Sequence, residues 1–251
     1  MVKVHHLNCV EILSLGYGRA IGHCLLIETE NKLILIDAGI GLQDTENPNN
    51  RLGQHLIDMV GFRFNREWTA IHQIQRLGLD PEKVTDCVLS HLDPDHIGAL
   101  VDFPHATLHM SQEEYDNFRS GNPRYLEHQL HHDSIIKTYA SSDDTWCDME
   151  ARKLSLASTL DIYLIPLFGH TRGHCGIALD LGAEKIFYVG DAYYLRSELT
   201  DNEHPVHKLA ELRADDNRLR QDALTKIRHF ILQHPETTVY SYHDPSEFPR
   251  N

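Results

Sequence analysis

Short apolar runs separated by polar turns predict β-strands along most of the chain. Residues 24–28 and 33–36 flank the polar turn 30–32, which is the pattern of a hairpin. The polar, asparagine-rich stretch 41–53 predicts a loop. Later apolar runs predict further strands at 84–89, 160–167, 176–181, 185–189 and 238–242.

Three segments have the spacing or the end signals of helices. The apolar residues of 67–77 share one face, and Gly78 can end that helix. Ser111 and Glu114 form a capping box that opens a second helix. An apolar stripe along 218–233 predicts a third. This order of elements predicts two packed sheets with helices outside them rather than a doubly wound sheet.

Composition and charge exclude several classes of function. The chain has 251 residues and a formal net charge of -14, which disfavours binding to the phosphate backbone of a nucleic acid. No stretch approaches the roughly 20 apolar residues of a membrane span. Five cysteines without a CxxC pair argue against a disulfide framework, so we expect a cytoplasmic protein without nucleic-acid or membrane partners.

The densest group of chemically active side chains directly follows the apolar run 84–89. His91, Asp93, Asp95 and His96 lie within six positions, and Pro94 between them indicates a loop. Imidazole and carboxylate together suit zinc, iron or manganese. Taken alone, this segment would be better interpreted as an acidic helix cap with two surface histidines.

Three further apolar runs are followed by residues of the same kind. They lead into Gly-His-Thr-Arg-Gly-His at 169–174, into Asp191 and into His243. A metal site assembled from loops at one edge of a sheet would explain all four segments together.

The order of these motifs resembles the metallo-β-lactamase superfamily, whose signature is His-x-His-x-Asp-His, then Gly-His, then an Asp and a late His. The match runs from the turn at Asp37 to His243, which is nearly the whole chain. The resemblance implies an α+β fold, the αβ/βα four-layer sandwich, with two mixed β-sheets and helices on the outer faces. It also implies one domain over 1–251, with an insertion at 112–150 that we expect to line or cover the pocket.

The resemblance also implies a two-metal site and its ligands. His91 and His174 would bind the first metal, Asp95, His96 and His243 the second, and Asp191 would bridge both. Of the two histidines in 169–174, the resemblance favours His174 as the ligand and His170 as a neighbour that hydrogen-bonds nearby backbone.

Asp93 departs from the family pattern, which has a histidine at this position. Asp93 could bind the first metal directly, which would favour iron or manganese over zinc, or bind it through water. Alternatively, the first site is weak and the protein holds one metal. We expect direct ligation, because aspartate retains a metal-binding group, and two divalent ions, with zinc first and iron or manganese as alternatives.

These residues predict a hydrolase of a small ester, lactone or thioester. Two cations that share Asp191 would lower the pKa of a shared water from 15.7 toward about 7, and Asp95 would orient the resulting hydroxide and accept its proton. Tyr194 follows Asp191 by three residues, as in the N-acyl homoserine lactone lactonases, and would either stabilise the oxyanion or pack over the site. The alternatives are a mononuclear iron enzyme that oxidises thiols or persulfides with oxygen, and a non-catalytic metal-binding module.

Overall fold

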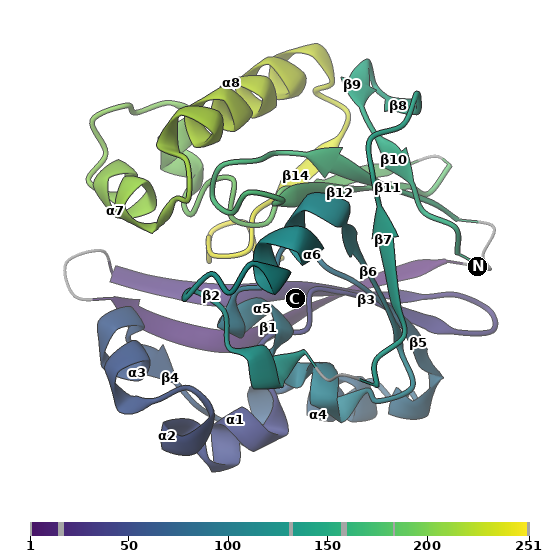
Figure 1. Ribbon diagram of the computed structural model, residues 1–251. Coiled ribbons are helices and arrows are strands. Elements are labelled where there is room, and N and C mark those ends of the chain that lie inside the picture. The colour runs from purple at the N-terminus through teal and green to yellow at the C-terminus, as the bar shows by residue number, and fades with distance from the viewer. Residues whose placement is uncertain (1, 15–17, 131–132, 157–159, 183, 250–251) are drawn as a thin grey trace.

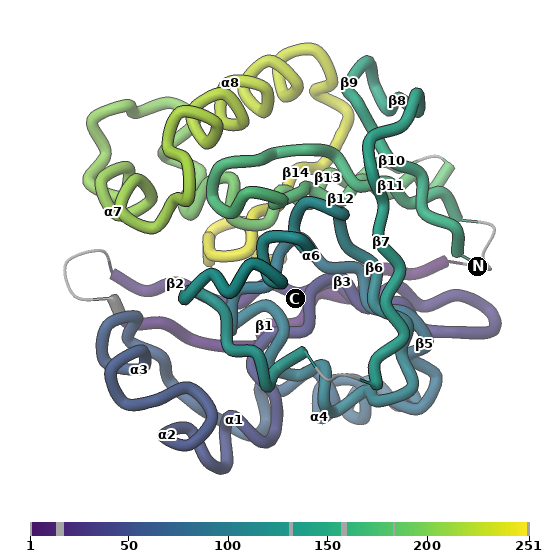
Figure 2. The backbone as a smooth tube through the Cα atoms, in the orientation of Figure 1, coloured from purple at the N-terminus to yellow at the C-terminus, as the bar shows by residue number. Residues whose placement is uncertain are grey.

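Two β-sheets pack face to face and carry helices on their outer sides in the computed structural model (Figure 1). The structure describes residues 2–14, 18–130, 133–156, 160–182 and 184–249. The tube in Figure 2 shows that the chain completes the first sheet before it enters the second, with α7 and α8 near its end. The four-layer αβ/βα sandwich that the sequence predicts is confirmed.

The first sheet is mixed and has the strand order β4-β1-β2-β3-β5-β6-β7. Its strands are β1 (Lys3–Ser14), β2 (Gly18–Glu28), β3 (Leu33–Ile36), β4 (Phe62–Arg63), β5 (Val84–Val88), β6 (Thr107–Ser111) and β7 (Ile136–Tyr139). The pairs β1–β2 and β2–β3 are antiparallel, whereas β3, β5, β6 and β7 run parallel to one another. Consequently β3 and β5 end at the same edge.

The second sheet is also mixed and has the order β10-β11-β12-β13-β14. Its strands are β10 (Arg152–Lys153), β11 (Asp161–Pro166), β12 (Cys175–Asp180), β13 (Lys185–Tyr188) and β14 (Thr238–Tyr240). Strands β11, β13 and β14 run in one direction and β12 in the other, because β12 is antiparallel to both β11 and β13, whereas β13 and β14 are parallel. A separate hairpin joins β8 (Thr145–Trp146) to β9 (Met149–Glu150).

Helices cover both outer faces of the sandwich (Figure 1). The first sheet carries α1 (Leu42–Glu46), α2 (Pro48–Arg51), α3 (Gln54–Val60) and α4 (Ala70–Arg76), and the second carries α7 (Val206–Arg213) and α8 (Asn217–Gln233). Two more helices are α5 (Pro94–Ile97) and α6 (Gln112–Arg119). Short 3-10 turns are η1 (Arg66–Trp68), η2 (Pro81–Lys83), η3 (Gly98–Asp102), η4 (Glu127–Gln129) and η5 (Arg196–Leu199). Among the described helices, none has the length and apolar character needed to cross a bilayer.

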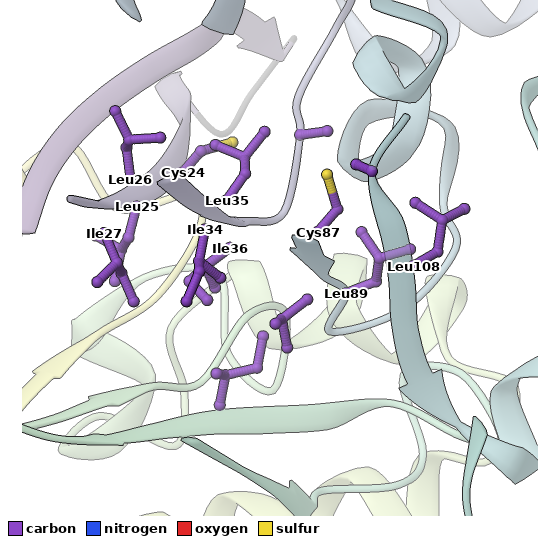
Figure 3. Close-up of a cluster of buried hydrophobic side chains, with 14 of the residues drawn as sticks. Cys24, Leu25, Leu26, Ile27, Ile34, Leu35, Ile36, Cys87, Leu89 and Leu108 are labelled. Atoms are coloured by element: carbon purple, nitrogen blue, oxygen red, sulfur yellow. The ribbon is translucent and has the colours of Figure 1, made fainter. Parts of the chain in front are cut away.

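The central strands of the first sheet are buried on both faces. Figure 3 shows Ile27 and Ile34 pointing to one side of the sheet and Leu26 and Leu35 to the other. All four are 0% exposed, and each such side chain contributes about 1.5–3 kcal/mol on burial. This burial explains why 24–28 and 33–36 are continuous apolar runs rather than alternating ones.

Two segments near the N-terminus differ from the prediction. The stretch 41–53 is not a loop: it forms α1 and α2, because Pro48 starts α2 and Arg51 pairs with Asp44 at 2.8 Å. Such short helices have no apolar stripe by which to recognise them. The helix predicted at 67–77 is shorter and follows η1, with Thr69 in an extended conformation between them.

Strand β1 was not predicted, and β2 begins before residue 24. Polar residues alternate with buried Leu7 and Cys9 in β1, because one face of this part of the sheet is less covered. The segment 112–150 is also more regular than an insertion: α6 opens it, β7 extends the first sheet beside β6, and β8–β9 follows. Residues 131–132 of this segment lie outside the described part.

Candidate metal centre

The predicted site residues gather where strands of both sheets end. In the first sheet, the loop 90–96 follows β5 beside the end of β3. In the second, segments 167–174, 189–192 and 241–244 follow β11, β13 and β14, which run in one direction. Because strands that run together end at one edge, four distant stretches of chain meet there.

Asp37 fixes the first loop from the end of β3. Its carboxylate accepts hydrogen bonds from the Ser90 backbone N–H at 2.8 Å, the Ser90 hydroxyl at 2.7 Å and the Tyr188 hydroxyl at 2.7 Å. His96 Nδ1 lies 2.8 Å from the same carboxylate. This contact sets the ring orientation of His96 and leaves its Nε2 for the site.

Glu114 joins the first loop to the second. It is 0% exposed and accepts hydrogen bonds from the Leu92 N–H at 2.9 Å, the Thr171 hydroxyl at 2.5 Å and the Gly173 N–H at 3.2 Å. A Cβ on Gly173 would lie 1.9 Å from the Glu114 nitrogen, so only glycine permits this approach. Burial raises the pKa of Glu114 to about 7, although hydrogen bonds from Thr171 and Tyr125 act the other way.

The imidazole and carboxylate groups form two neighbouring clusters. In each cluster three candidate ligand atoms lie within 4.8 Å of one another: His91, His170 and Asp191 in the first, and Asp95, His96 and His243 in the second. Asp191 also reaches the second cluster, because its oxygens lie 3.3 Å from His96 Nε2 and 3.3 Å from His243 Nε2. The two clusters therefore meet at Asp191.

As far as the structure describes the chain, several buried polar atoms of these clusters make no hydrogen bond. They are His91 Nε2, His96 Nε2 and one Asp191 oxygen. Buried polar atoms nearly always have a partner, and an unpaired one costs about 1–3 kcal/mol. Divalent ions between the imidazole and carboxylate groups would satisfy all three atoms, so the residues present fit a metal centre.

Burial and neighbouring charges set the protonation of the clusters. Burial lowers the pKa of both His91 and His170, which keeps these imidazoles neutral and able to bind a metal. Burial would also lower the pKa of His96 and His243, but the Asp191 carboxylate raises both above the usual value. A metal ion would therefore displace protons from these two rings.

The structure reverses the expected positions of His170 and His174. His174 uses both ring nitrogens on backbone: Nδ1 lies 3.0 Å from the Leu167 carbonyl oxygen, and Nε2 accepts the Asp191 N–H at 3.0 Å. His170 Nε2 instead lies 3.5 Å from an Asp191 oxygen and belongs to the first cluster. The sequence contains a signal that distinguishes the two histidines. His174 directly precedes β12, so its position is fixed by the start of the strand, whereas His170 lies within the loop.

Asp93 faces the first cluster and is paired with Arg124. One of its oxygens lies 3.2 Å from His170 Nε2 and 3.5 Å from His91 Nε2. Arg124 Nε and Nη2 each donate to one Asp93 oxygen at 2.7 Å. Burial would raise the pKa of Asp93, but the Arg124 guanidinium holds it well below its usual value. The histidine of the family pattern is thus replaced by an ion pair that has no net charge.

Tyr194 lies beside both clusters. Its hydroxyl is 3.5 Å from His170 Nδ1, and its ring centroid lies 5.2 Å from that of His243. The buried Glu198 carboxylate accepts the Tyr194 N–H at 2.7 Å and the Leu195 N–H at 3.1 Å, which fixes this turn of the chain. Because these hydrogen bonds fix the backbone at Tyr194, they also fix the position of its side chain at the site.

A cavity of about 120 Å³ opens onto the clusters. Asp93, Asp95, Asp191, Tyr194 and His243 form its polar end. Its other walls come from β1, β2, α3, the turn after Tyr194 and α7. Within the described part of the chain, no residue of 112–150 lines this cavity, and that the segment covers the pocket stays a prediction. That segment instead supplies Arg124 and Glu114, which form hydrogen bonds to both loops 90–96 and 167–174.

Sequence reasoning missed Arg124 and Arg213. Arg124 lies in a polar stretch without a motif, and only the fold brings it to Asp93, 31 positions away. Arg213 ends α7 and lines the cavity. The spacing of Val206, Leu209 and Arg213 on one helical face was the available signal.

Comparison with known proteins agrees with this geometry. A family model described as the metallo-beta-lactamase superfamily matches residues 17–243. A probable metallo-hydrolase of Mycobacterium tuberculosis is 32% identical over 255 aligned positions, which cover 97% of this chain and 81% of that protein. The N-acyl homoserine lactonase AttM of Agrobacterium fabrum is 33% identical over 114 positions, 45% of this chain and 43% of that protein.

Solved structures show the same fold. An N-acyl homoserine lactone hydrolase, with the product N-hexanoyl-L-homoserine at its catalytic metal centre, superposes with a TM-score of 0.76 at 16% identity, covering 98% of this chain and 94% of that one. The dizinc lactonase AidC superposes with a TM-score of 0.59 at 21% identity, covering 90% and 74%.

Proposed function

Because the chain belongs to the metallo-beta-lactamase superfamily, we propose that it is a hydrolase that uses two divalent metal ions to cleave a small ester or lactone. The observation that carries the proposal is the pair of three-residue clusters that meet at Asp191 and leave buried ring nitrogens unpaired. Such atoms have no role in packing and match the ligands of a two-metal hydrolase.

We assign the ligands from the clusters. His91 and His170 would hold the first ion, Asp95, His96 and His243 the second, and Asp191 both. Asp93 would add an oxygen to the first ion, since that oxygen already faces His91 and His170. When bound, such ions lower the pKa of a water molecule and polarise a carbonyl oxygen.

We propose zinc as the metal. The ligand nitrogens are imidazoles, which suit zinc, and the dizinc lactonase AidC has the same fold. In the sequence analysis, the negative charge of Asp93 favoured iron or manganese, because no cation that compensates this charge could be identified. The two hydrogen bonds from Arg124 compensate that charge, so the first site keeps the net charge that a histidine would give it.

Two residues of the chain take part in the reaction beyond binding the metals. Asp95 lines the cavity and lies 3.8 Å from His243 Nε2, where its carboxylate can orient the attacking water and accept its proton. The Tyr194 hydroxyl can donate to the oxygen that becomes negative, because it lies beside the first cluster and lines the same cavity.

The cavity supports a small substrate with an apolar part. The walls away from the clusters are formed by Ile12 of β1, Ala20 of β2, Met59 and Val60 of α3, and Leu209 of α7. An acyl chain or the apolar side of a lactone fits such walls. We keep the cytoplasm as the proposed location, on the cysteine pattern.

The test combines metal analysis with turnover. Protein purified without added metal is analysed for zinc, iron and manganese, and assayed on lactones and 4-nitrophenyl esters while oxygen uptake is recorded. We expect two zinc ions per chain, hydrolysis that Asp95→Asn abolishes, and normal activity in Asp222→Asn, a control on the exposed face of α8. One iron per chain with oxygen uptake would favour the oxidase, and bound metal without turnover a binding module.

A further inference from the structure

Arg213 is the last residue of α7 and lines the cavity beside Tyr194. Val206, Leu209 and Arg213 lie at i, i+3 and i+7, so they share the helical face that borders the cavity. Val206 and Leu209 are apolar. Arg213 places a charged side chain at the next position of this face, where an apolar residue would extend the apolar wall of the cavity. A cation at a helix C-terminus is favourable in itself, but that preference does not select this face.

The guanidinium of Arg213 has no hydrogen bond or ion pair with any residue that the structure describes. The other arginines at the cavity or behind it differ in this respect. Arg124 donates to Asp93 and Asp215, and Arg19, at the cavity rim, pairs with Glu11. Arg213 is only partly buried, so water can solvate its guanidinium where no described protein group pairs with it.

The carboxylates near Arg213 are already engaged. Both oxygens of Asp93 accept from Arg124, and Asp215 accepts from Arg124 and Asn117. Asp191 belongs to the metal clusters. The charge of Arg213 nevertheless acts on the site. Burial and the Asp191 carboxylate raise the pKa of the Tyr194 phenol, whereas the positive charge of Arg213 lowers it. Arg213 is therefore a cation that lines the cavity and has no protein anion to bind among the described residues.

We propose that Arg213 binds a carboxylate of the substrate, so that the protein acts on esters or lactones that carry an acidic group besides the bond that is cleaved. The guanidinium fork matches a carboxylate in shape and charge. The apolar walls would hold the chain between that carboxylate and the reacting carbonyl. This inference rests on the proposed hydrolase function and narrows its substrate class.

The test uses two esters of equal chain length, 4-nitrophenyl hexanoate and the mono-4-nitrophenyl ester of adipic acid, with the metal-loaded protein. The wild type should prefer the acidic ester. A charge-assisted hydrogen bond predicts that Arg213→Gln lowers kcat/KM for this ester about 10- to 100-fold. For hexanoate the change should stay below about threefold. Arg213→Lys keeps the charge without the fork and should fall between. Arg218→Gln, on the exposed start of α8, is the matched control.

A binding measurement separates the two proposals. Isothermal titration of the metal-loaded protein with adipate and with hexanoate should show tighter binding of adipate, and Arg213→Gln should abolish that difference. Equal effects of Arg213→Gln on both esters, or an unchanged preference for adipate in this variant, would overturn the role of Arg213. If the wild type hydrolyses neither ester, the hydrolase proposal fails on these substrates, and the titration still decides whether Arg213 binds the carboxylate.

Discussion

Alanine variants of His170 and His174, made one at a time, distinguish a residue that binds metal from one that supports the fold. We expect His170 to bind metal and His174 to support the fold. His174 makes two buried hydrogen bonds to backbone, with the Leu167 carbonyl and the Asp191 N–H, each at 3.0 Å. Its loss leaves both groups unpaired, at about 1–3 kcal/mol each, and opens a cavity. We expect His174→Ala to lower the unfolding free energy of the metal-free protein by about 3–5 kcal/mol, much of the about 5–15 kcal/mol that holds a typical domain.

His170→Ala should behave in the opposite way. The ring of His170 contacts carboxylates at 3.2 and 3.5 Å, and Arg124 already pairs with one of them. No described backbone group forms a hydrogen bond with the His170 ring, so we expect a smaller loss than for His174→Ala, about 1–3 kcal/mol in the metal-free protein, mostly from the cavity left by the buried ring, but a fall in bound metal from about two ions per chain toward one.

Urea unfolding of metal-free protein and elemental analysis of folded protein measure the two quantities independently. The reasoning fails if His174→Ala leaves the metal-free stability unchanged and loses an ion, while His170→Ala keeps both ions. That result would mean that His174 turns its ring into the site when metal binds.

Three further changes probe the network around the site. Arg124→Leu removes the cation that pairs with the buried Asp93 carboxylate, so stability should fall by about 3–5 kcal/mol, and the added change Asp93→Asn should recover part of it in thermal unfolding. Burial would raise the pKa of Asp86, but hydrogen bonds from His109 and Lys32 hold it well below its usual value. Asp86 thus stabilises the fold above about pH 4 and loses this effect as the pH falls; Asp86→Asn should weaken the protein at pH 7 and flatten its acid transition, and an unchanged pH profile would contradict this. Tyr194→Phe should lower kcat about 10- to 100-fold with the metal content unchanged; unaltered kinetics would show that the ring only packs over the site.

The sequence predicts the parts of the fold that burial alone determines. The runs 24–28 and 33–36 are strands because both faces of their sheet are covered, and this shows directly as continuous apolar residues. Strand β1 and helices α1 and α2 depend on contacts that a pattern does not contain, such as the pairing of β1 with β2 and of Arg51 with Asp44. These elements are determined by tertiary contacts, and the hydrophobic periodicity of the sequence does not reveal such contacts.

The same division applies to the site. Motif order places the loops of His91, His96, Asp191 and His243 together, since all follow predicted strand ends. It does not decide between two histidines four residues apart, because that choice depends on which ring the Leu167 carbonyl and Asp191 N–H engage. Nor does it reveal that a distant arginine compensates Asp93.

The most direct test of the account is a crystal structure of protein purified without added metal, with anomalous diffraction recorded at the zinc edge. The account predicts two ions: one among His91, His170 and Asp191, and one among Asp95, His96 and His243, with Asp191 between them. An ion bound to His174, or crystals in which His91 and His96 bind no metal at all, would contradict it.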